Sequence, residues 1–355
     1  MGKNILITGA AGYIGGSILA SIIARKDGLI ESSNISAVVR SAEQVKALVK
    51  LGVNVIKLDF TDEASVIQAV VDNKIDLVIH TASSMDTRQA SALISGLGQR
   101  RKIGGEEIYF IHTSLTTMFA AEGGWPYGEI KDTDPVYEKE KQIEKGNPVR
   151  DTNIFIVEHA KVLGVTSFIV PVPFVYGVGT GECRKQSVYL PSHIQAFIKL
   201  KAVYIWDKEG NPPAAHISDV VSLYALLAEK ILKQETIPSG EKGYYFVVGH
   251  KSPWWNVMKH LSDVMFARGL VKQAATPTWP SDEMAADALG LPLAYIRAME
   301  TSSGEMIAVN GPQLGWHLEW DQDRYLGSMD EEVRAVLEMT TIKATIFDNL
   351  LKLDK

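Results

Sequence analysis

The chain of 355 residues contains one cysteine, Cys183. A single cysteine excludes an intramolecular disulfide and a cysteine-based metal site, so we expect a reducing cytosolic compartment and no bound metal. No stretch reaches the roughly 18 apolar residues that a membrane-spanning helix needs. Residues 8–16 also interrupt the apolar N-terminus, which excludes a signal peptide of the usual form. We therefore expect a cytoplasmic protein with no membrane partner.

The sequence also lacks a concentration of charge of one sign. Its 36 Lys and Arg residues are scattered among 42 Asp and Glu residues, and the net charge is −6. No basic stripe is available for a phosphate backbone, which excludes nucleic acid as the expected partner. Hydrophobic residues make up 46% of the chain, enough for a large core divided between two lobes.

The most informative segment is a glycine turn that follows the apolar run at residues 4–7. Residues 8–15 read Thr-Gly-Ala-Ala-Gly-Tyr-Ile-Gly, and a helix-like stretch follows at residues 16–24. Such a turn lets the backbone approach a pyrophosphate, while the N–H groups and dipole of the helix favour its negative charge. The turn residues that we expect to contact a nucleotide cofactor are Gly9, Ala11, Gly12, Tyr13, Ile14 and Gly15.

The first half of the chain alternates between strand and helix patterns. Strands are expected over residues 35–40, 53–57, 76–80, 107–112 and 167–171, and helices over residues 41–50, 61–71, 86–101 and 151–163. Residues 123–148 are polar and predict a surface excursion. This order predicts an α/β fold with a Rossmann-type doubly wound parallel sheet, whose ligands bind outside the carboxyl ends of the strands.

The second half is less regular. Helices are expected over residues 192–200 and 218–232, a strand is expected over residues 244–248, and five of the seven tryptophans lie in the last third. We predict that residues 1–175 form the nucleotide-binding domain, with a sheet contribution from about residues 200–250. Residues 176–355 would mainly form a smaller substrate-covering lobe, with discontinuous boundaries.

Three further strings resemble elements of the extended and atypical short-chain dehydrogenase/reductase (SDR) superfamily. They are Val-Ile-His-Thr-Ala at residues 78–82, Pro-Phe-Val-Tyr-Gly at residues 173–177 and Ala-His-Ile-Ser-Asp-Val at residues 215–220. Together with the glycine spacing, they make residues 1 to about 235 similar to the NAD(P)-dependent epimerase/dehydratase-like proteins of filamentous fungi. The resemblance implies a nucleotide cofactor and, as a family expectation, a homodimer.

The end of the second expected strand bears on cofactor choice. Arg40 would pair with a 2′-phosphate through two N–H groups, which favours NADP over NAD, and Ser41 would add a hydroxyl donor. Alternatively, Arg40 lies on the adenine ring or is solvated. Asp59 resembles the SDR aspartate at the adenine amino group, with helix capping as its alternative. The resemblance adds further cofactor contacts at Phe60, His80, Thr81, Ala82 and Pro173.

Catalysis in the superfamily uses a Ser or Thr, a Tyr, and a Lys four residues later whose ammonium lowers the pKa of the phenol. Ser114 matches the hydroxyl position, with capping of the next helix as the alternative. Tyr137 and Lys141 form a literal Tyr-x-x-x-Lys, although their separation from the Val-Tyr-Gly turn exceeds the usual spacing. Either an insertion preserves this dyad, or it is lost and other chemistry falls to Arg150, His159 or Tyr176.

The resulting prediction is an NADPH-dependent oxidoreductase that reduces a carbonyl of a small or medium metabolite. Ser114 would hold the carbonyl oxygen, Tyr137 would donate the proton, and Lys141 would acidify Tyr137. Two alternatives stay open: an epimerase, dehydratase or isomerase that retains its cofactor, and a nucleotide-sensing regulator without catalysis. The sequence does not identify the small-molecule substrate.

Overall fold

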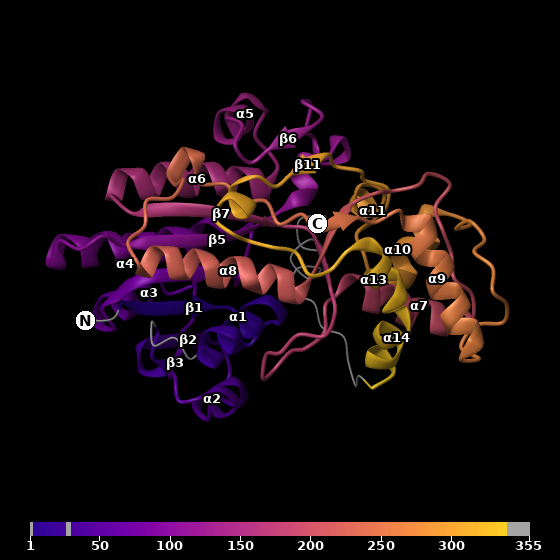
Figure 1. Ribbon diagram of the computed structural model, residues 1–355, viewed down its shortest axis with the longest axis horizontal. Helices are drawn as coiled ribbons and strands as arrows, with labels where there is room; N and C mark the ends of the chain where they lie inside the picture. The colour runs from indigo at the N-terminus through magenta and orange to yellow at the C-terminus, as the bar shows by residue number, and fades with distance from the viewer. Residues whose placement is uncertain (1–2, 26–29, 339–355) are drawn as a thin grey trace.

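A computed structural model describes residues 3–25 and 30–338 (Figure 1). Its centre is a six-stranded sheet in the order β3-β2-β1-β4-β5-β7, in which every neighbouring pair is parallel. The strands are β1 (Asn4–Thr8), β2 (Ile35–Val39), β3 (Asn54–Lys57), β4 (Ile75–His80), β5 (Tyr109–Leu115) and β7 (Thr166–Val172). This arrangement confirms the predicted doubly wound sheet.

The central strands form because their apolar runs are buried on both faces, as parallel sheets require. All residues of β2 and β4 are buried. The direction of winding changes between β1 and β4, which are neighbours in the sheet although β2 and β3 separate them in sequence. A doubly wound sheet binds its ligands at such a switch point, outside the carboxyl ends of the strands.

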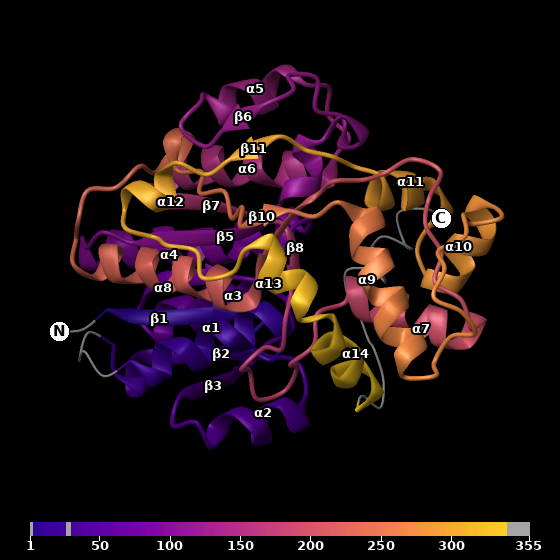
Figure 2. The ribbon, with the colours of Figure 1, turned by 45° about the vertical axis from the view of Figure 1, so that its right-hand side comes forward.

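Helices cover both faces of the sheet (Figures 1 and 2). One face carries α1 (Tyr13–Ala24), α2 (Ala42–Val49) and α8 (Ile217–Leu232), and the other carries α3 (Glu63–Asp72), α4 (Thr87–Gly104) and α6 (Pro148–Leu163). Each face has its own apolar core. Asp62, Asp86 and Asn147 cap the helices that follow them with side-chain oxygens, which explains why these helices begin where they do.

The structure shifts the ends of several expected elements, including α7 (Tyr189–Leu200) and β5, and two differences have a clear physical reason. Helix α6 begins at Pro148 rather than at residue 151, because Asn147 accepts the N–H groups of Val149 and Arg150 and a proline at the first position needs no partner. Residues 244–248 form no continuous strand. Tyr245 and Val247 donate backbone hydrogen bonds to β7 at 2.9 and 3.1 Å, but Pro171 of β7 has no N–H to extend the ladder.

The remaining elements lie beyond the carboxyl ends of the sheet or above β7 (Figures 1 and 2). Beyond the sheet, a third apolar core joins α7, α9, α10, α11, α13 and α14. Their bounds are α7 (Tyr189–Leu200), α9 (Trp254–Ala267), α10 (Asp282–Leu289), α11 (Leu293–Glu300), α13 (Gln322–Gly327) and α14 (Met329–Leu337).

Short strands connect these parts. A three-stranded sheet contains β8 (Phe174–Tyr176), β9 (Pro213–His216) and β10 (His250–Lys251), and a second pair joins β6 (Ile130–Lys131) to β11 (Met306–Ile307). Helix α5 (Val136–Gln142) lies in the polar excursion and α12 (Asn310–Gln313) follows β11. No helix in the described ranges is both long and apolar enough to cross a membrane. The predicted domain ranges extend into residues 1–2, 26–29 and 339–355, which lie outside the described residues.

Candidate functional site

The glycine turn joins β1 to α1 at the switch point of the sheet. Gly9 has a φ of 69° and makes a tight turn in which the Gly12 N–H donates to its carbonyl at 2.7 Å. A Cβ on Gly9 would lie 2.7 Å from Thr81 Oγ1, and a Cβ on Gly15 would overlap the same hydroxyl and the Gly9 carbonyl. Gly12 begins α1 without a side-chain cap. The first N–H groups of α1 therefore offer an anion site.

Side chains at the ends of β1 and β4 hold this turn in place. Thr8 Oγ1 lies 2.8 Å from His80 Nδ1, and Thr81 Oγ1 donates to the Thr8 carbonyl at 2.7 Å. Burial lowers the pKa of His80 to about 4, so this imidazole is neutral at physiological pH. His80 and Thr81, which the sequence predicts to contact the cofactor, thus help to fix the turn in the protein itself. Ala82, which follows them, is half-buried.

Arg40 and Ser41 follow β2 at the same edge. Arg40 is exposed, its backbone N–H donates to Gln44 Oε1 at 2.9 Å, and its guanidinium makes no ion pair within residues 3–25 and 30–338. It is therefore available to a phosphate. The Ser41 hydroxyl accepts the Gln44 N–H at 3.3 Å in a capping box, so its observed role is to begin α2.

Asp59 and Phe60 follow β3. Asp59 Oδ1 accepts the backbone N–H of Thr61 at 2.9 Å and the Thr61 hydroxyl at 2.8 Å, and these bonds lower the pKa of the exposed carboxyl. These bonds order the turn before α3, whereas the helix-capping role that was the alternative for Asp59 belongs to Asp62. Phe60 packs against the core beneath α3 and α4, and Pro173 is buried between β7 and β8.

Ser114 lies near the carboxyl end of β5 with an unusual set of neighbours. Its hydroxyl is fully buried and has no partner in the described part of the chain, and it caps no helix. Within residues 3–25 and 30–338, both ring nitrogens of His112 and Nε2 of His80 are also buried without a hydrogen bond of normal geometry, although the Ser83 and Ser84 backbone lies close to the two rings. The two imidazoles stack at 5.6 Å, and burial lowers the pKa of each. Unpaired buried polar atoms of this kind indicate a ligand or water position.

Tyr137 and Lys141 lie on α5, outside α6 (Figure 1). The Tyr137 hydroxyl donates to Glu158 at 3.0 Å, and the Lys141 ammonium lies 3.7 Å from the same carboxylate. Burial raises the pKa of Tyr137, which is the reverse of the shift that acid catalysis by a phenol needs.

The position of Glu158 along α6 shows how far this pair lies from Ser114. The first turn of α6 contacts the segment after β5, where Arg150 donates to the Met118 carbonyl at 3.2 Å, and the last turn leads into the start of β7. Glu158 is ten residues into the helix, about 15 Å along its axis. The structure does not bring Tyr137 and Lys141 to Ser114, which corrects their predicted placement.

The three alternative residues have structural partners. Arg150 is 2% exposed and donates to the carbonyls of Met118, Gly123 and Gly124. The Tyr176 hydroxyl lies 2.9 Å from His250 Nε2. His159, in the second half of α6, has its Nε2 3.3 Å from the Ser95 hydroxyl of α4. Within the described residues, none of these three side chains forms a hydrogen bond with Ser114.

Long-range contacts that the sequence motifs do not predict also position the site. The Tyr13 hydroxyl donates to the carbonyls of Tyr176 and Gly177 at 2.9 and 2.7 Å, and thereby joins the glycine turn to β8. These residues are more than 160 positions apart, and no local pattern signals the contact. The only sequence signals were the separate glycine and Val-Tyr-Gly strings.

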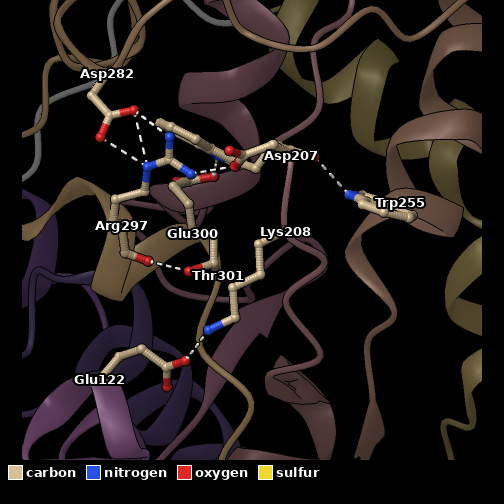
Figure 3. A network of polar contacts seen from close by, with 9 residues as sticks. Glu122, Asp207, Lys208, Trp255, Asp282, Arg297, Glu300 and Thr301 are labelled. Carbon is tan, nitrogen blue, oxygen red and sulfur yellow. Dashed lines mark hydrogen bonds and ion pairs between the residues drawn. The ribbon is translucent and has the colours of Figure 1, made fainter.

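A polar network on the C-terminal lobe was also missed (Figure 3). Arg297 of α11 binds Asp282 of α10 through Nε at 2.8 to 2.9 Å and also contacts Asp207. Lys208 then reaches Glu122, shortly after β5, at 2.7 Å. This exposed network fastens the lobe to the segment that follows Ser114.

The parallel sheet and its glycine turn define a Rossmann-type α/β class of fold. The model of the "NAD dependent epimerase/dehydratase family" matches residues 5–97, the segment that contains β1 to β4 and the glycine turn. The match covers the first part of the chain and agrees with the resemblance to epimerase/dehydratase-like proteins that the sequence motifs predicted.

Similar proteins extend the comparison to most of the chain. An oxidase, ucsJ, from an Acremonium species is 24% identical over 297 residues, which cover 77% of this chain and 81% of the relative. The UDP-glucose 4-epimerase of Thermotoga maritima is 16% identical with a TM-score of 0.64, covering 94% and 100% of the two chains. The dTDP-glucose 4,6-dehydratase of Bacillus anthracis, in complex with NAD, is 12% identical with a TM-score of 0.63, covering 94% and 97%. The two structural similarities establish the fold.

Proposed function

We propose that the chain binds NADP(H) across the carboxyl edge of the sheet and reduces a carbonyl group of a small or medium metabolite beside Ser114. The observation that carries the proposal is the uncapped start of α1 behind a turn where Gly9 and Gly15 leave no room for side chains. Backbone N–H groups at such a turn suit the pyrophosphate of a dinucleotide. The family match over residues 5–97 supports the same cofactor class.

Arg40 supports the choice of NADP over NAD. Arg40 directly follows β2, and its exposed guanidinium has no carboxylate partner in the described ranges. A guanidinium pairs with a phosphate through two parallel N–H groups, whereas an acidic residue at this edge would repel the 2′-phosphate.

Ser114 supports carbonyl chemistry. Its buried hydroxyl has no protein partner in the described residues and would donate a hydrogen bond to the substrate oxygen. The nicotinamide supplies hydride when NADPH is bound, and water would supply the proton that completes the alcohol. Tyr137 and Lys141 are left out of this proposal because their partner is Glu158.

Two observations favour other functions on the same cofactor site. The family match favours epimerisation or dehydration with a retained cofactor. The first two turns of α6, residues 148–155, contain neither a Tyr nor a Lys. The missing pair favours a nucleotide-sensing regulator.

Calorimetric titration with NADPH and NADH tests the cofactor, and incubation of the NADPH complex with a panel of ketones and aldehydes tests the reaction. We expect NADPH to bind at least about tenfold more tightly than NADH. Consumption of NADPH supports a reductase, whereas binding without consumption supports the alternatives. Absence of binding to either nucleotide would overturn the cofactor site itself.

A further inference from the structure

A row of polar side chains crosses three strands of the sheet near its carboxyl edge. The parallel register places Thr8 of β1 beside His80 of β4, and His80 beside His112 of β5. All three side chains are fully buried. Strands of a parallel sheet that helices cover on both faces are normally apolar at such positions. Apolar packing therefore does not explain this polar row.

One end of the polar row is tied to the glycine turn. Thr8 Oγ1 accepts the Thr81 N–H at 3.2 Å and lies 2.8 Å from His80 Nδ1. Since this oxygen already accepts one hydrogen bond, its own hydrogen is available for Nδ1. The His80 ring is thus held in place, and it stacks on the His112 ring at 5.6 Å with 21° between their planes.

The other end of the polar row lies next to Ser114. Side chains alternate along a strand, so His112 and Ser114 project from the same face of β5, about 7 Å apart along the strand. Thr113, between them, projects from the opposite face, where its hydroxyl lies 2.5 Å from that of Tyr224 in α8. His112 is therefore the polar neighbour that β5 itself gives to Ser114.

His112 and Ser114 also lack hydrogen-bond partners together. In the described ranges, Ser114 Oγ and both His112 ring nitrogens are buried without a hydrogen bond of normal geometry. The Ser84 backbone lies close to the His112 ring, which accounts for one nitrogen and leaves the other. Unpaired buried polar groups are costly, and a buried water typically joins two to four of them. Two side chains about 7 Å apart that make no direct hydrogen bond suit one bridging water.

We propose that one buried water joins His112 to Ser114 Oγ, and that His112 thereby acts as a positioning residue for the hydroxyl that binds the carbonyl. This inference rests on the proposed reductase function. The water accepts from a ring N–H or donates to an unprotonated ring nitrogen, and in either case it has a hydrogen left for Ser114 Oγ. The hydroxyl hydrogen of Ser114 then points away from the water and toward the substrate oxygen.

This arrangement strengthens the Ser114 hydroxyl as a donor. Hydrogen bonds in a chain polarise one another, so an oxygen that accepts a bond from water donates its own hydrogen more strongly. Burial lowers the pKa of His112 well below its ordinary value, so the ring is neutral near pH 7. His112 therefore orients Ser114 through a hydrogen bond and is not the acid that completes the alcohol.

The first experiment needs no cofactor. NMR spectra of protein with isotopically labelled histidine nitrogens would be recorded, and the signals lost in His112→Gln identify those of His112. We expect Ser114→Ala to shift these signals, because the water loses one of its partners. Thr113→Val, the matched change on the opposite face of β5, should leave them nearly in place. Equal shifts in the two variants, or no shift in Ser114→Ala, would overturn the bridge.

The second experiment measures NADPH consumption by the full-length protein with a carbonyl substrate. His112→Phe keeps an aromatic ring against His80 and removes both ring nitrogens. We expect turnover to fall about tenfold while NADPH affinity stays unchanged. In a Ser114→Ala background the same change should cost little more, because both residues act through one hydroxyl. His112→Gln keeps a donor and an acceptor, so it should retain part of the turnover, and it replaces His112→Phe if that variant does not fold.

The outcomes separate this inference from the proposed function. If the wild type consumes no NADPH, the reductase proposal fails and the positioning role of His112 fails with it, while the NMR shifts still decide whether His112 and Ser114 are joined. If the wild type is active and the losses from His112→Phe and Ser114→Ala simply multiply, only the role of His112 is overturned. Calorimetric titration with NADPH and thermal denaturation of each variant check cofactor binding and folding.

Discussion

The Tyr137 hydroxyl lies 3.0 Å from a carboxylate oxygen of Glu158, in the second half of α6. This contact assigns the Tyr-x-x-x-Lys string to the packing of α5 on α6. Because the first turn of α6, not its second half, lies beside the end of β5, the phenol is directed away from Ser114. Tyr137 and Lys141 thus have the spacing of a catalytic pair, but both side chains contact Glu158 instead.

Tyr137→Phe tests this assignment. The variant removes one hydrogen bond to a carboxylate that is about half exposed, so we expect a loss of stability of about 0.5 to 1 kcal/mol. NADPH affinity and consumption should stay within about threefold of the wild type. Chemical denaturation and NADPH titration provide the two measurements. A fall in NADPH consumption by about two orders of magnitude, the size of lost general acid catalysis, would restore Tyr137 to the active site.

Gly12→Val tests the anion site at the start of α1. A Cβ on Gly12 would lie 3.0 Å from the Gly9 carbonyl oxygen, which is closer than an ordinary contact, so this carbonyl must shift and we expect a folded variant with some loss of stability. The added methyl groups would occupy the space where the backbone meets phosphate. We expect NADPH binding to be abolished while the circular dichroism spectrum is retained. Gly327→Ala, at a position where nothing lies within 4 Å, is the control.

Arg40→Ala tests cofactor selectivity. Loss of a charge-assisted, two-pronged contact with the 2′-phosphate should weaken NADPH binding by about 1.5 to 3 kcal/mol and leave NADH binding unchanged. Lys46→Ala removes the same charge from an exposed position on α2 and should affect neither nucleotide. Equal losses for NADPH and NADH in Arg40→Ala would instead show that the guanidinium stacks on adenine. Calorimetry distinguishes the two results.

Glu140 gives the protein a predicted dependence of stability on pH. Both carboxylate oxygens of this fully buried residue accept hydrogen bonds, from Tyr244 at 2.5 Å and from Asn153 at 3.2 Å. Burial raises the pKa of Glu140 to about 8, against an ordinary value of 4.5. The folded state therefore holds a proton that the unfolded state releases between these values. The stability that it contributes is complete below about pH 4.5 and is lost as the pH rises through about 8.

Glu140→Gln should flatten this part of the pH profile, because the amide resembles the protonated acid. Urea denaturation between about pH 5 and 8 would measure the unfolding free energy, whose slope for one proton is at most about 1.4 kcal/mol per pH unit. Glu332, whose pKa burial raises to about 7, contributes in the same direction in both proteins. The exposed Glu138→Gln is the control. Parallel profiles for wild type and Glu140→Gln would contradict the prediction.

The sheet could be predicted from the sequence because its signals are local. Apolar runs, helix-capping residues such as Asp62 and Asp86, and the glycine turn each depend on a few neighbouring residues. The expected strand at residues 244–248 was wrong because its partner strand carries Pro171, which cannot donate the next hydrogen bond. A propensity pattern in one segment contains no information about the strand beside it.

The candidate site could be predicted only in part, for the same reason. The glycine turn follows β1 and Ser114 lies near the end of β5, so the topology alone brings them to the carboxyl edge. Tyr137 lies in a long excursion whose path depends on contacts such as Glu140 with Tyr244, more than 100 residues apart.

Ser114→Ala and Thr113→Val form a matched pair that tests the reacting position. The Ser114 hydroxyl is buried without a protein partner in the described residues, whereas Thr113 Oγ1 lies 2.5 Å from the Tyr224 hydroxyl. Removing the unpaired Ser114 hydroxyl should leave thermal stability unchanged or slightly higher, while Thr113→Val leaves Tyr224 unpaired and should cost about 1 to 3 kcal/mol. For NADPH consumption with a carbonyl substrate the order reverses: Ser114→Ala should lose about tenfold or more, and Thr113→Val should remain active. If Ser114→Ala is destabilised and fully active, its hydroxyl has a structural role and the carbonyl-binding position lies elsewhere on the sheet edge.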